Sequence, residues 1–255
     1  MGRIVEPTPT SRGGTEPRPV RAGVWARAAV VLLAFVVIAV VGSWPQVVAL
    51  NVEVLLAFQR LLPIGTVDPI ALLLVFGSSQ VSLCLLMAAG AWLYLRGDRL
   101  VALSFALLLV GVAVEVALKA TLAHPMVWSE FSHGPGMYPF PEVKTTGVIT
   151  LRGPFPSGHV FRASYLAMTA VAVLGYRLVG RGGQALTVGA GVFIAGIVFG
   201  VFYLGWHWPT DALGSLALAY ALTAPTRWAV TAHGMPGIRL IRRQDYRGRT
   251  TGRSD

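Results

Sequence analysis

Apolar residues in this chain gather in long runs, and polar residues interrupt them at only a few places. A run of about twenty apolar residues is long enough to cross the hydrocarbon core of a bilayer as a helix. Six such runs are present, at about residues 25–44, 69–95, 100–123, 159–178, 184–205 and 210–231. The pattern therefore predicts an all-α, polytopic membrane protein built as a bundle of six transmembrane helices.

Two segments between the runs have patterns of their own. Residues 46–62 read as an amphipathic helix, which we expect to lie in the outer interface of the membrane. Residues 124–156 form a long connection rich in Gly, Pro and aromatic residues. Connections of this length are usually functional or disordered. This one is therefore either a lid or lipid-access element over a site, or a plain connector.

Composition supports a membrane protein and divides the chain into three parts. The 255 residues are 55% hydrophobic and only 13% charged, unlike those of an average soluble domain. The first run lacks the cleavage pattern of a signal peptide, so we expect it to remain as a span. We predict a disordered basic tail over residues 1–24, a membrane domain over residues 25–231 and a basic cytoplasmic tail over residues 232–255.

The net charge of +10 is concentrated on one side of the predicted topology. With six spans, both tails and the connections near Arg96 and Arg177 fall on the same side and carry most of the 21 basic residues. The positive-inside rule assigns that side to the cytoplasm. Basic residues beside spans favour the anionic headgroups of membrane lipids, so no nucleic-acid partner is expected. Arg outnumbers Lys by 19 to 2, which is typical of GC-rich bacteria, and we expect a bacterial cell (inner) membrane.

The same topology gathers the unusual polar residues on the opposite, extracytoplasmic face. The third run ends there near Lys119 and His124, the fourth begins there at His159, and the fifth ends there at His207. Ionisable residues within or beside spans are costly and point to a functional site. Nothing in their spacing resembles a metal cluster, and no metal or cofactor is expected.

The segment Pro156-Ser-Gly-His159 stands where the fourth run begins. A helix start offers free N–H groups and the positive end of the helix dipole, which together bind an oxyanion. Ser157 is able to cap the helix and donate its hydroxyl, and Gly158 lets the backbone approach the anion closely. A plain N-cap would explain Ser157 and Gly158 alone, but not their pairing with two histidines.

His207 and Asp211 are four residues apart and flank Pro209, which is suited to the first position of a helix. One helical turn brings the carboxylate to the imidazole, which fixes the imidazole tautomer and raises its basicity. A histidine oriented in this way is a competent nucleophile toward phosphorus.

These residues resemble the type 2 phosphatidic-acid phosphatase superfamily of integral membrane lipid phosphatases, whose pattern is KxxxxxxRP, PSGH and SRxxxxxHxxxD. The PSGH block is complete at residues 156–159, His207 and Asp211 match the third block, and Lys119 matches the start of the first. The resemblance covers about residues 69–231.

The resemblance implies roles for the matching residues. His207, oriented by Asp211, would attack phosphorus and form a phosphohistidine, and His159 would protonate the leaving oxygen. Lys119 would hold phosphate oxygens, together with Ser157 and the backbone of Gly158.

The chain departs from the family pattern at both motif arginines. Met126 and Val127 stand where the first block has Arg-Pro, and Gly200 and Val201 stand where the third block has Ser-Arg. A phosphoryl transition state requires compensating positive charge.

Three residues are candidates to replace the missing arginines. Arg162 lies one helical turn beyond His159, and its planar fork suits two phosphate oxygens. Arg152 is a second candidate, and His124 followed by Pro125 is the nearest substitute for Arg-Pro in the first block. Glu115, one turn before Lys119, is expected to hold that lysine in place.

The expected function is hydrolysis of a lipid phosphate, either an isoprenoid-carrier pyrophosphate or a glycerolipid phosphate. Two alternatives remain open. The missing arginines favour a non-catalytic lipid-phosphate binding or transport protein on the same scaffold. A lipid phosphotransferase would use the same residues.

Overall fold

The computed structural model describes residues 20–62, 67–127, 131, 153–175, 178 and 180–233, and these residues form helices and no strands. Most of the predicted tails and of the connection 124–156 lie outside the described residues, but residues 20–24, predicted to be disordered, form the start of a helix. The helices are α1 (Val20–Val41), α2 (Pro45–Gln59), α3 (Val67–Leu74), the short 3-10 helix η2 (Val75–Gly77), α4 (Ser79–Leu95), α5 (Arg99–Phe105), α6 (Leu107–Thr121), α7 (Gly158–Gly175), α8 (Arg181–Tyr203), α9 (Pro209–Leu222) and α10 (Ala224–His233).

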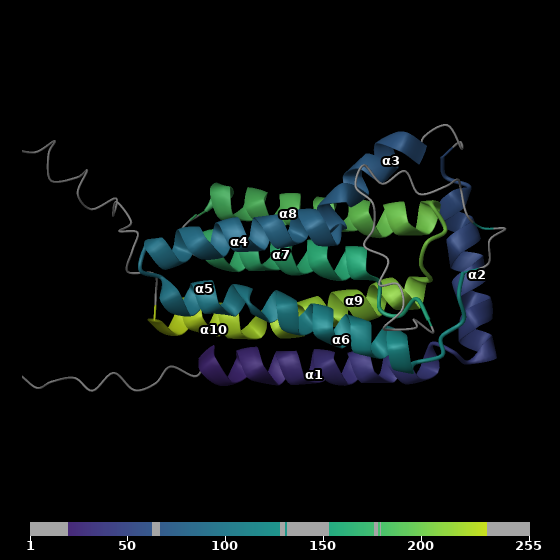
Figure 1. Ribbon diagram of the computed structural model, residues 1–255, viewed down its shortest axis with the longest axis horizontal. Helices are drawn as coiled ribbons and strands as arrows, with labels where there is room; N and C mark the ends of the chain where they lie inside the picture. The colour runs from purple at the N-terminus through teal and green to yellow at the C-terminus, as the bar shows by residue number, and fades with distance from the viewer. Residues whose placement is uncertain are drawn as a thin grey trace, which may run out of the picture.

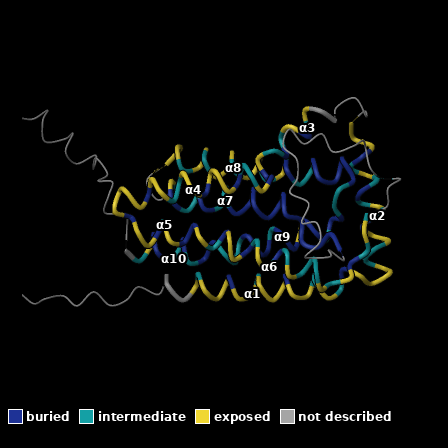
Figure 2. Tube along the Cα trace, in the orientation of Figure 1, coloured by how far each residue is buried: buried dark blue, intermediate teal, exposed yellow. Residues whose placement is uncertain are grey.

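Most of the helices run side by side along the long axis of the molecule, with α7 at the centre (Figure 1). α7 packs against α4, α6, α8, α9 and α10. Every residue from Gly158 to Tyr165 is buried, whereas α1, α4 and α8 expose much of their length (Figure 2). Exposed side chains on the outer helices include Val30, Leu33 and Val192, which is the surface expected to face lipid.

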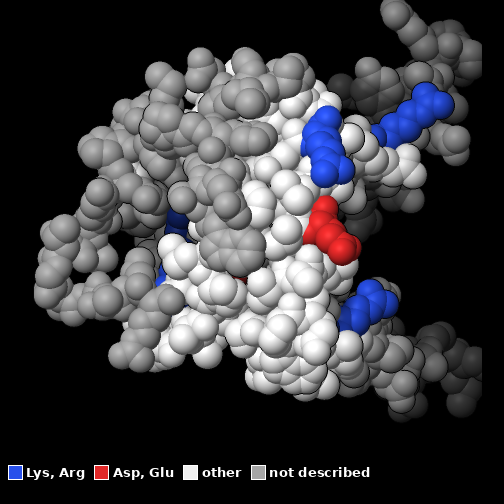
Figure 3. Space-filling model, turned by 90° about the vertical axis from the view of Figure 1, so that its right-hand side faces the viewer, with Lys and Arg blue, Asp and Glu red and all other residues white. Residues whose placement is uncertain are grey.

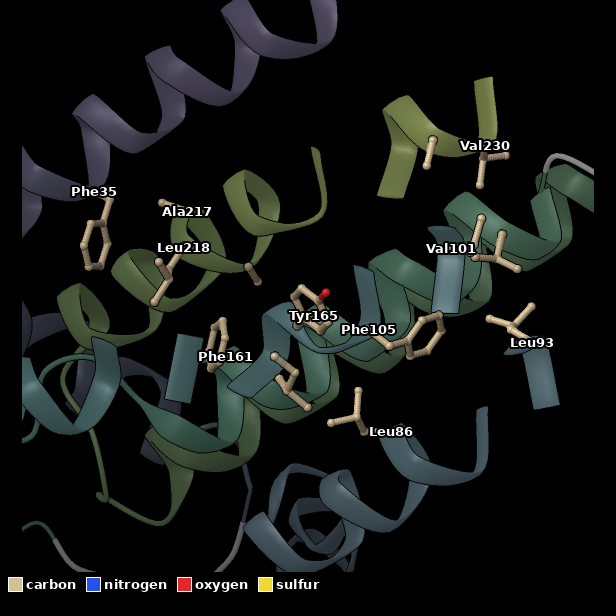
Figure 4. Close-up of a cluster of buried hydrophobic side chains, with 14 of the residues drawn as sticks. Phe35, Leu86, Leu93, Val101, Phe105, Phe161, Tyr165, Ala217, Leu218 and Val230 are labelled. Carbon is tan, nitrogen blue, oxygen red and sulfur yellow. The ribbon is translucent and has the colours of Figure 1, made fainter. Parts of the chain in front are cut away.

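Aromatic side chains of α7 fill the space between its neighbours (Figure 4). Phe161 and Tyr165 belong to a cluster of buried apolar residues that also takes Leu86 from α4 and Leu218 from α9. The Phe161 ring lies against Gly111 of α6, and a Cβ there would collide with it. The start of α7 is thus held on several sides.

The six predicted spans are each occupied by a helix or a pair of helices, but six crossings are not confirmed. Three described helical segments are long and apolar enough to cross a bilayer: Gly23–Val41, Arg99–Thr121 and Arg181–Tyr203. The pair Pro69–Gly77 and Ser79–Leu95, bent by 49°, raises the number to four if it counts as one span. α7 and α9 fall short because α7 begins with polar residues and α9 ends after 14 residues. Six spans therefore stay a prediction.

The amphipathic segment forms α2, which lies across one end of the bundle (Figure 1). Its buried polar side chains bond to neighbouring helices. Asn51 donates from Nδ2 to Thr210 Oγ1 at 3.0 Å and accepts from the Thr210 N–H at 3.2 Å. Gln59 donates from Nε2 to the carbonyls of Phe131 at 2.6 Å and Tyr203 at 3.3 Å. α1 begins and α10 ends at the opposite end of the bundle.

Candidate active site

Segments that are distant in the sequence meet at the end of the bundle crossed by α2 (Figure 1). The end of α6, the start of α7 and the connection from α8 to α9 lie together there, linked by hydrogen bonds and ion pairs. Viewed from this end, the described surface is largely uncharged, with a few separate charged side chains (Figure 3). Of the charged residues of the candidate site, Glu115, Arg162 and Asp211 are buried and Lys119 is partly buried.

The start of α7 is tied to the start of α9. Ser157 Oγ accepts a long capping bond of 3.5 Å from the Val160 N–H, and the Ser157 N–H donates to the Asp211 carbonyl at 3.2 Å. Ser215 Oγ lies 2.8 Å from the Ser157 carbonyl and 2.7 Å from the Asp211 carbonyl. Ser157, Asp211 and Ser215 are all fully buried. The PSGH turn and the His–Asp segment therefore form one hydrogen-bonded unit.

His207 and Asp211 form the pair expected from their spacing. His207 Nδ1 lies 3.4 Å from Asp211 Oδ2, and the same oxygen accepts from the Trp208 N–H at 2.9 Å. Asp211 lies in the first turn of α9, where the helix dipole favours a carboxylate. Because Nδ1 faces Asp211, Nε2 is the nitrogen left for chemistry. The His207 side chain is 12% exposed, so it remains reachable.

A tight turn at Gly205 brings His207 back toward His159. Gly205 has φ +68°, and a Cβ there would collide with the Phe131 carbonyl, so the turn requires glycine. The His159 ring lies 5.6 Å from the Trp206 ring, centroid to centroid. His159 is 5% exposed, and Trp206, which its ring faces, directly precedes His207 in the chain. Both imidazoles thus belong to one site.

Two cations flank the imidazoles, and one carboxylate joins them. Glu115 of α6 accepts from Lys119 Nζ and from Arg162 NH1, each at 2.8 Å. The Glu115–Lys119 pairing expected from the sequence is confirmed. Arg162 also donates from Nε to the Gly77 carbonyl at 2.9 Å. Gly158 lies directly against this ion pair, and a Cβ there would collide with Glu115 and lie 2.6 Å from Arg162 NH1.

His124, predicted to bind phosphate, contacts α1 and Phe155 in the structure, and its role in binding phosphate stays a prediction. Its Nε2 lies 2.8 Å from the Ala39 carbonyl of α1, and its ring stacks on Phe155 with centroids 4.7 Å apart. His124 is also buried to 4% exposure. It therefore packs the end of α6 onto α1, because the chain turns toward α1 directly after α6 ends.

The structure also locates the two positions where the family pattern has arginine. Met126 is 61% exposed, and Val201 is fully buried in an apolar cluster with Leu74 and Ile197. Neither position brings charge to the site. Among the described arginines, Arg162 brings positive charge to the site. Arg152 lies outside the described residues.

Three supporting contacts were missed by the sequence reasoning. The Glu115–Arg162 ion pair had a signal, because a carboxylate inside an apolar run needs a partner. The sequence contained only a weak signal for the Ser215 contact, namely its position one turn beyond Asp211 on α9. It contained no signal for the contact between the Gly77 carbonyl and Arg162, because the two residues are 85 positions apart.

The arrangement is chemically suited to phosphoryl transfer to an imidazole. A histidine with one nitrogen held by a carboxylate is a nucleophile, and a second histidine beside it is a general acid. Lys119, Arg162 and the N-terminus of α7 provide positive charge and N–H groups for the phosphoryl oxygens.

Comparisons with known proteins bear on the fold and the family of the chain. A comparison with curated proteins gives no match. Among solved structures, the fold resembles that in "Crystal structure of the first transmembrane PAP2 type phosphatidylglycerolphosphate phosphatase from Bacillus subtilis", with a TM-score of 0.60 and 19% identity. The similarity covers 77% of this chain and 92% of that chain. The chain is accordingly a helical, multi-pass membrane protein.

The family model of the PAP2 superfamily matches residues 99–234. The match includes α5 to α10 and every residue of the site described above except Gly77. It extends over more than half of the chain, and the chain therefore belongs to the PAP2 superfamily.

Proposed function

We propose that this protein is a metal-independent membrane lipid phosphatase that removes phosphate from a lipid phosphate or pyrophosphate through a phosphohistidine intermediate. The observation that carries the proposal is the His207–Asp211 pair beside buried His159, next to the cations Lys119 and Arg162. Membership of the PAP2 superfamily supports a phosphatase. Among the described residues, no group of three or more His, Cys, Asp or Glu side chains is arranged to hold a metal ion.

In the first step, Nε2 of His207 attacks phosphorus and forms an N–P bond while the bond from phosphorus to the lipid oxygen breaks. Asp211 stabilises the positive charge that develops on the imidazole. His159 gives its proton to the leaving oxygen, which departs as the lipid alcohol or the lipid monophosphate.

In the second step, water replaces the imidazole on phosphorus. His159, now deprotonated, takes a proton from the water as the new P–O bond forms and the N–P bond breaks. Inorganic phosphate leaves, and both histidines return to their starting states. The same histidine serves as acid and then as base, as reversible proton transfer requires.

Five groups would hold the phosphoryl oxygens. Lys119 and Arg162 carry the positive charge, and Arg162 takes the place of the motif arginines. The Ser157 hydroxyl and the N–H groups at Gly158 and His159 lie at the start of α7, where the positive end of the helix dipole favours an anion. These donors would act most strongly where charge builds up in the transition state.

The predicted topology places the site at the extracytoplasmic face of a bacterial cell membrane. Substrates would therefore be isoprenoid-carrier pyrophosphates or glycerolipid phosphates in the outer leaflet. The exposed apolar surfaces of the outer helices are consistent with substrate arriving from the bilayer.

A non-catalytic lipid-phosphate binder is the second candidate. The apolar burial of Val201 and the exposure of Met126 favour it, because they leave the site with fewer cations than the family pattern. A binder would keep the phosphate contacts without turnover.

Phosphate release from a panel of lipid phosphates, measured in detergent with a metal chelator present, tests the two candidates. The panel should include phosphatidic acid, phosphatidylglycerol phosphate and an isoprenyl pyrophosphate. We expect wild-type protein to release phosphate and His207→Ala to fall to the background rate, because the nucleophile is gone. Arg162→Ala should lose much of the activity, and Arg60→Lys, at an exposed arginine of the same end, serves as a control.

The outcomes separate the candidates. Binding of lipid phosphate without release by wild-type protein would establish the binder. Full activity in Arg162→Ala would remove its role as the substitute arginine and leave the histidine mechanism in place.

A further inference from the structure

We infer that Glu115 is a positioning residue that sets both the geometry and the net charge of the phosphate site. The inference deepens the proposed function and rests on it. The family resemblance assigns no role to this position, and its spacing predicted only a local pairing with Lys119.

Glu115 contacts both cations of the site. Oε1 accepts from Lys119 Nζ and Oε2 accepts from Arg162 NH1, each at 2.8 Å. The side chains of Glu115 and Arg162 are 6% and 7% exposed, and that of Lys119 is 16% exposed. The carboxylate therefore joins α6 to α7 within the apolar bundle.

The bonds of Arg162 orient its remaining donors. Its Nε–H is held by the Gly77 carbonyl, and one NH1 hydrogen is held by Glu115. A guanidinium has five N–H groups, so three are left by these two bonds. Gly158 lies against the guanidinium without an intervening side chain. The remaining donors thus lie beside the start of α7, where the phosphate is proposed to bind.

Charge follows from the same contacts. Two cations and one carboxylate leave a net charge of +1 on this group. Without the carboxylate, the two cations would repel each other. Burying unpaired charge in a helix bundle is also costly. Glu115 therefore makes it possible to hold Lys119 and Arg162 side by side before the substrate arrives.

Glutamine at position 115 separates this role from mere packing. Its shape matches glutamate, but its amide has one oxygen that accepts and one NH2 group that only donates. Glutamine would keep the bond to one cation, Lys119 or Arg162, through its amide oxygen. Its NH2 group would face the other cation and could not accept a bond from it. The phosphate site would gain one net positive charge while one of its cations loses its fixed position.

The test compares Glu115→Gln with wild type and with Glu53→Gln, the same change at an exposed glutamate of α2. We expect kcat of Glu115→Gln to fall about ten- to a hundredfold, since misplacement by about 1 Å costs on the order of a hundredfold. The inhibition constant of Glu115→Gln for inorganic phosphate should equal that of wild type or be lower, because the site has become more positive. Glu53→Gln should match wild type in both values.

A double-mutant cycle measures whether the changes at Glu115 and Arg162 are coupled, which a purely structural role of Glu115 would not require. If Glu115 acts through Arg162, Glu115→Gln should cost little further activity in an Arg162→Lys background. Additive losses would overturn the inference, and so would a kcat of Glu115→Gln within twofold of wild type. If Glu115→Gln does not fold, Glu115→Asp, which keeps the charge and shortens the reach, is measured in its place by the kcat and double-mutant criteria.

Binding of inorganic phosphate to the purified proteins distinguishes failure of this inference from failure of the proposed function. An inactive wild type would refute the phosphatase, and equal or tighter phosphate binding in Glu115→Gln would still support the charge role. Clearly weaker phosphate binding in Glu115→Gln, with wild-type thermal stability, would overturn it.

Discussion

At the scale of single residues, Asp211 combines two tasks in one fully buried carboxylate. Its Oδ2 accepts the Trp208 N–H at 2.9 Å, which caps the start of α9, and lies 3.4 Å from His207 Nδ1. Capping holds the carboxylate in place, and the carboxylate in turn orients the imidazole. Local structure and proposed catalysis therefore depend on the same atom.

Asp211→Asn should separate these tasks. The amide oxygen of asparagine can still accept from Trp208, so the thermal midpoint should stay close to that of wild type. The neutral amide cannot stabilise the imidazolium of His207, and we expect kcat to fall by roughly a hundred- to ten-thousandfold. Steady-state phosphate release and thermal unfolding measure the two effects, and near-normal activity would refute the role assigned to Asp211.

At the scale of elements, the break between α3 and α4 has a consequence for the site. η2 ends at Gly77, whose backbone approaches that of His159 so closely that a Cβ would lie 2.7 Å from the His159 carbonyl oxygen. The carbonyl of Gly77 also accepts from Arg162. The bent helix pair thus supports one histidine and one cation of the site together.

Gly77→Ala should therefore impair both stability and activity. Added volume in a packed interior costs about 1–3 kcal/mol, and the shift would move the backbone of His159 and the acceptor of Arg162. Gly90→Ala in α4 is the matched control, because its Cβ would meet the nearest atom, in Phe105, at 3.9 Å. Activity and thermal midpoints of both variants should be compared, and a fully active Gly77→Ala would contradict this account.

At the scale of the whole molecule, the site and the ends of the described chain lie at opposite ends of the bundle. α1 begins and α10 ends at one end, and α2 crosses the other (Figure 1). An even number of crossings would give this arrangement. The positive-inside rule assigns the basic connections to the cytoplasm, and we therefore predict that the site faces outward.

Cysteine labelling in intact cells tests this topology. In a Cys84→Ser background, a cysteine replacing exposed Glu53 should react with a membrane-impermeant maleimide added outside. A cysteine replacing exposed Arg96, at the other end of α4, should react only after the membrane is permeabilised. The reverse pattern would invert the orientation, and labelling of both from outside would contradict a span formed by α3 and α4.

Contacts within one helical turn were predictable from the sequence. The Glu115–Lys119 and His207–Asp211 pairs and the Ser157 cap are three or four residues apart, and the geometry of a helix or of its N-terminal cap brings such residues together. The positions of the helices followed from the lengths of the apolar runs in the same way. The residue types of the site and their order along the chain were therefore readable from the sequence by itself.

Contacts between helices were decided only by the tertiary structure. Arg162 meets Glu115 across 47 residues and Gly77 across 85, and His124 turns to Ala39. Such contacts depend on how each helix is rotated and shifted against its neighbours, which packing of the whole bundle sets. No local spacing encodes that rotation, so the sequence named Arg162 as a candidate and the fold determined what holds it.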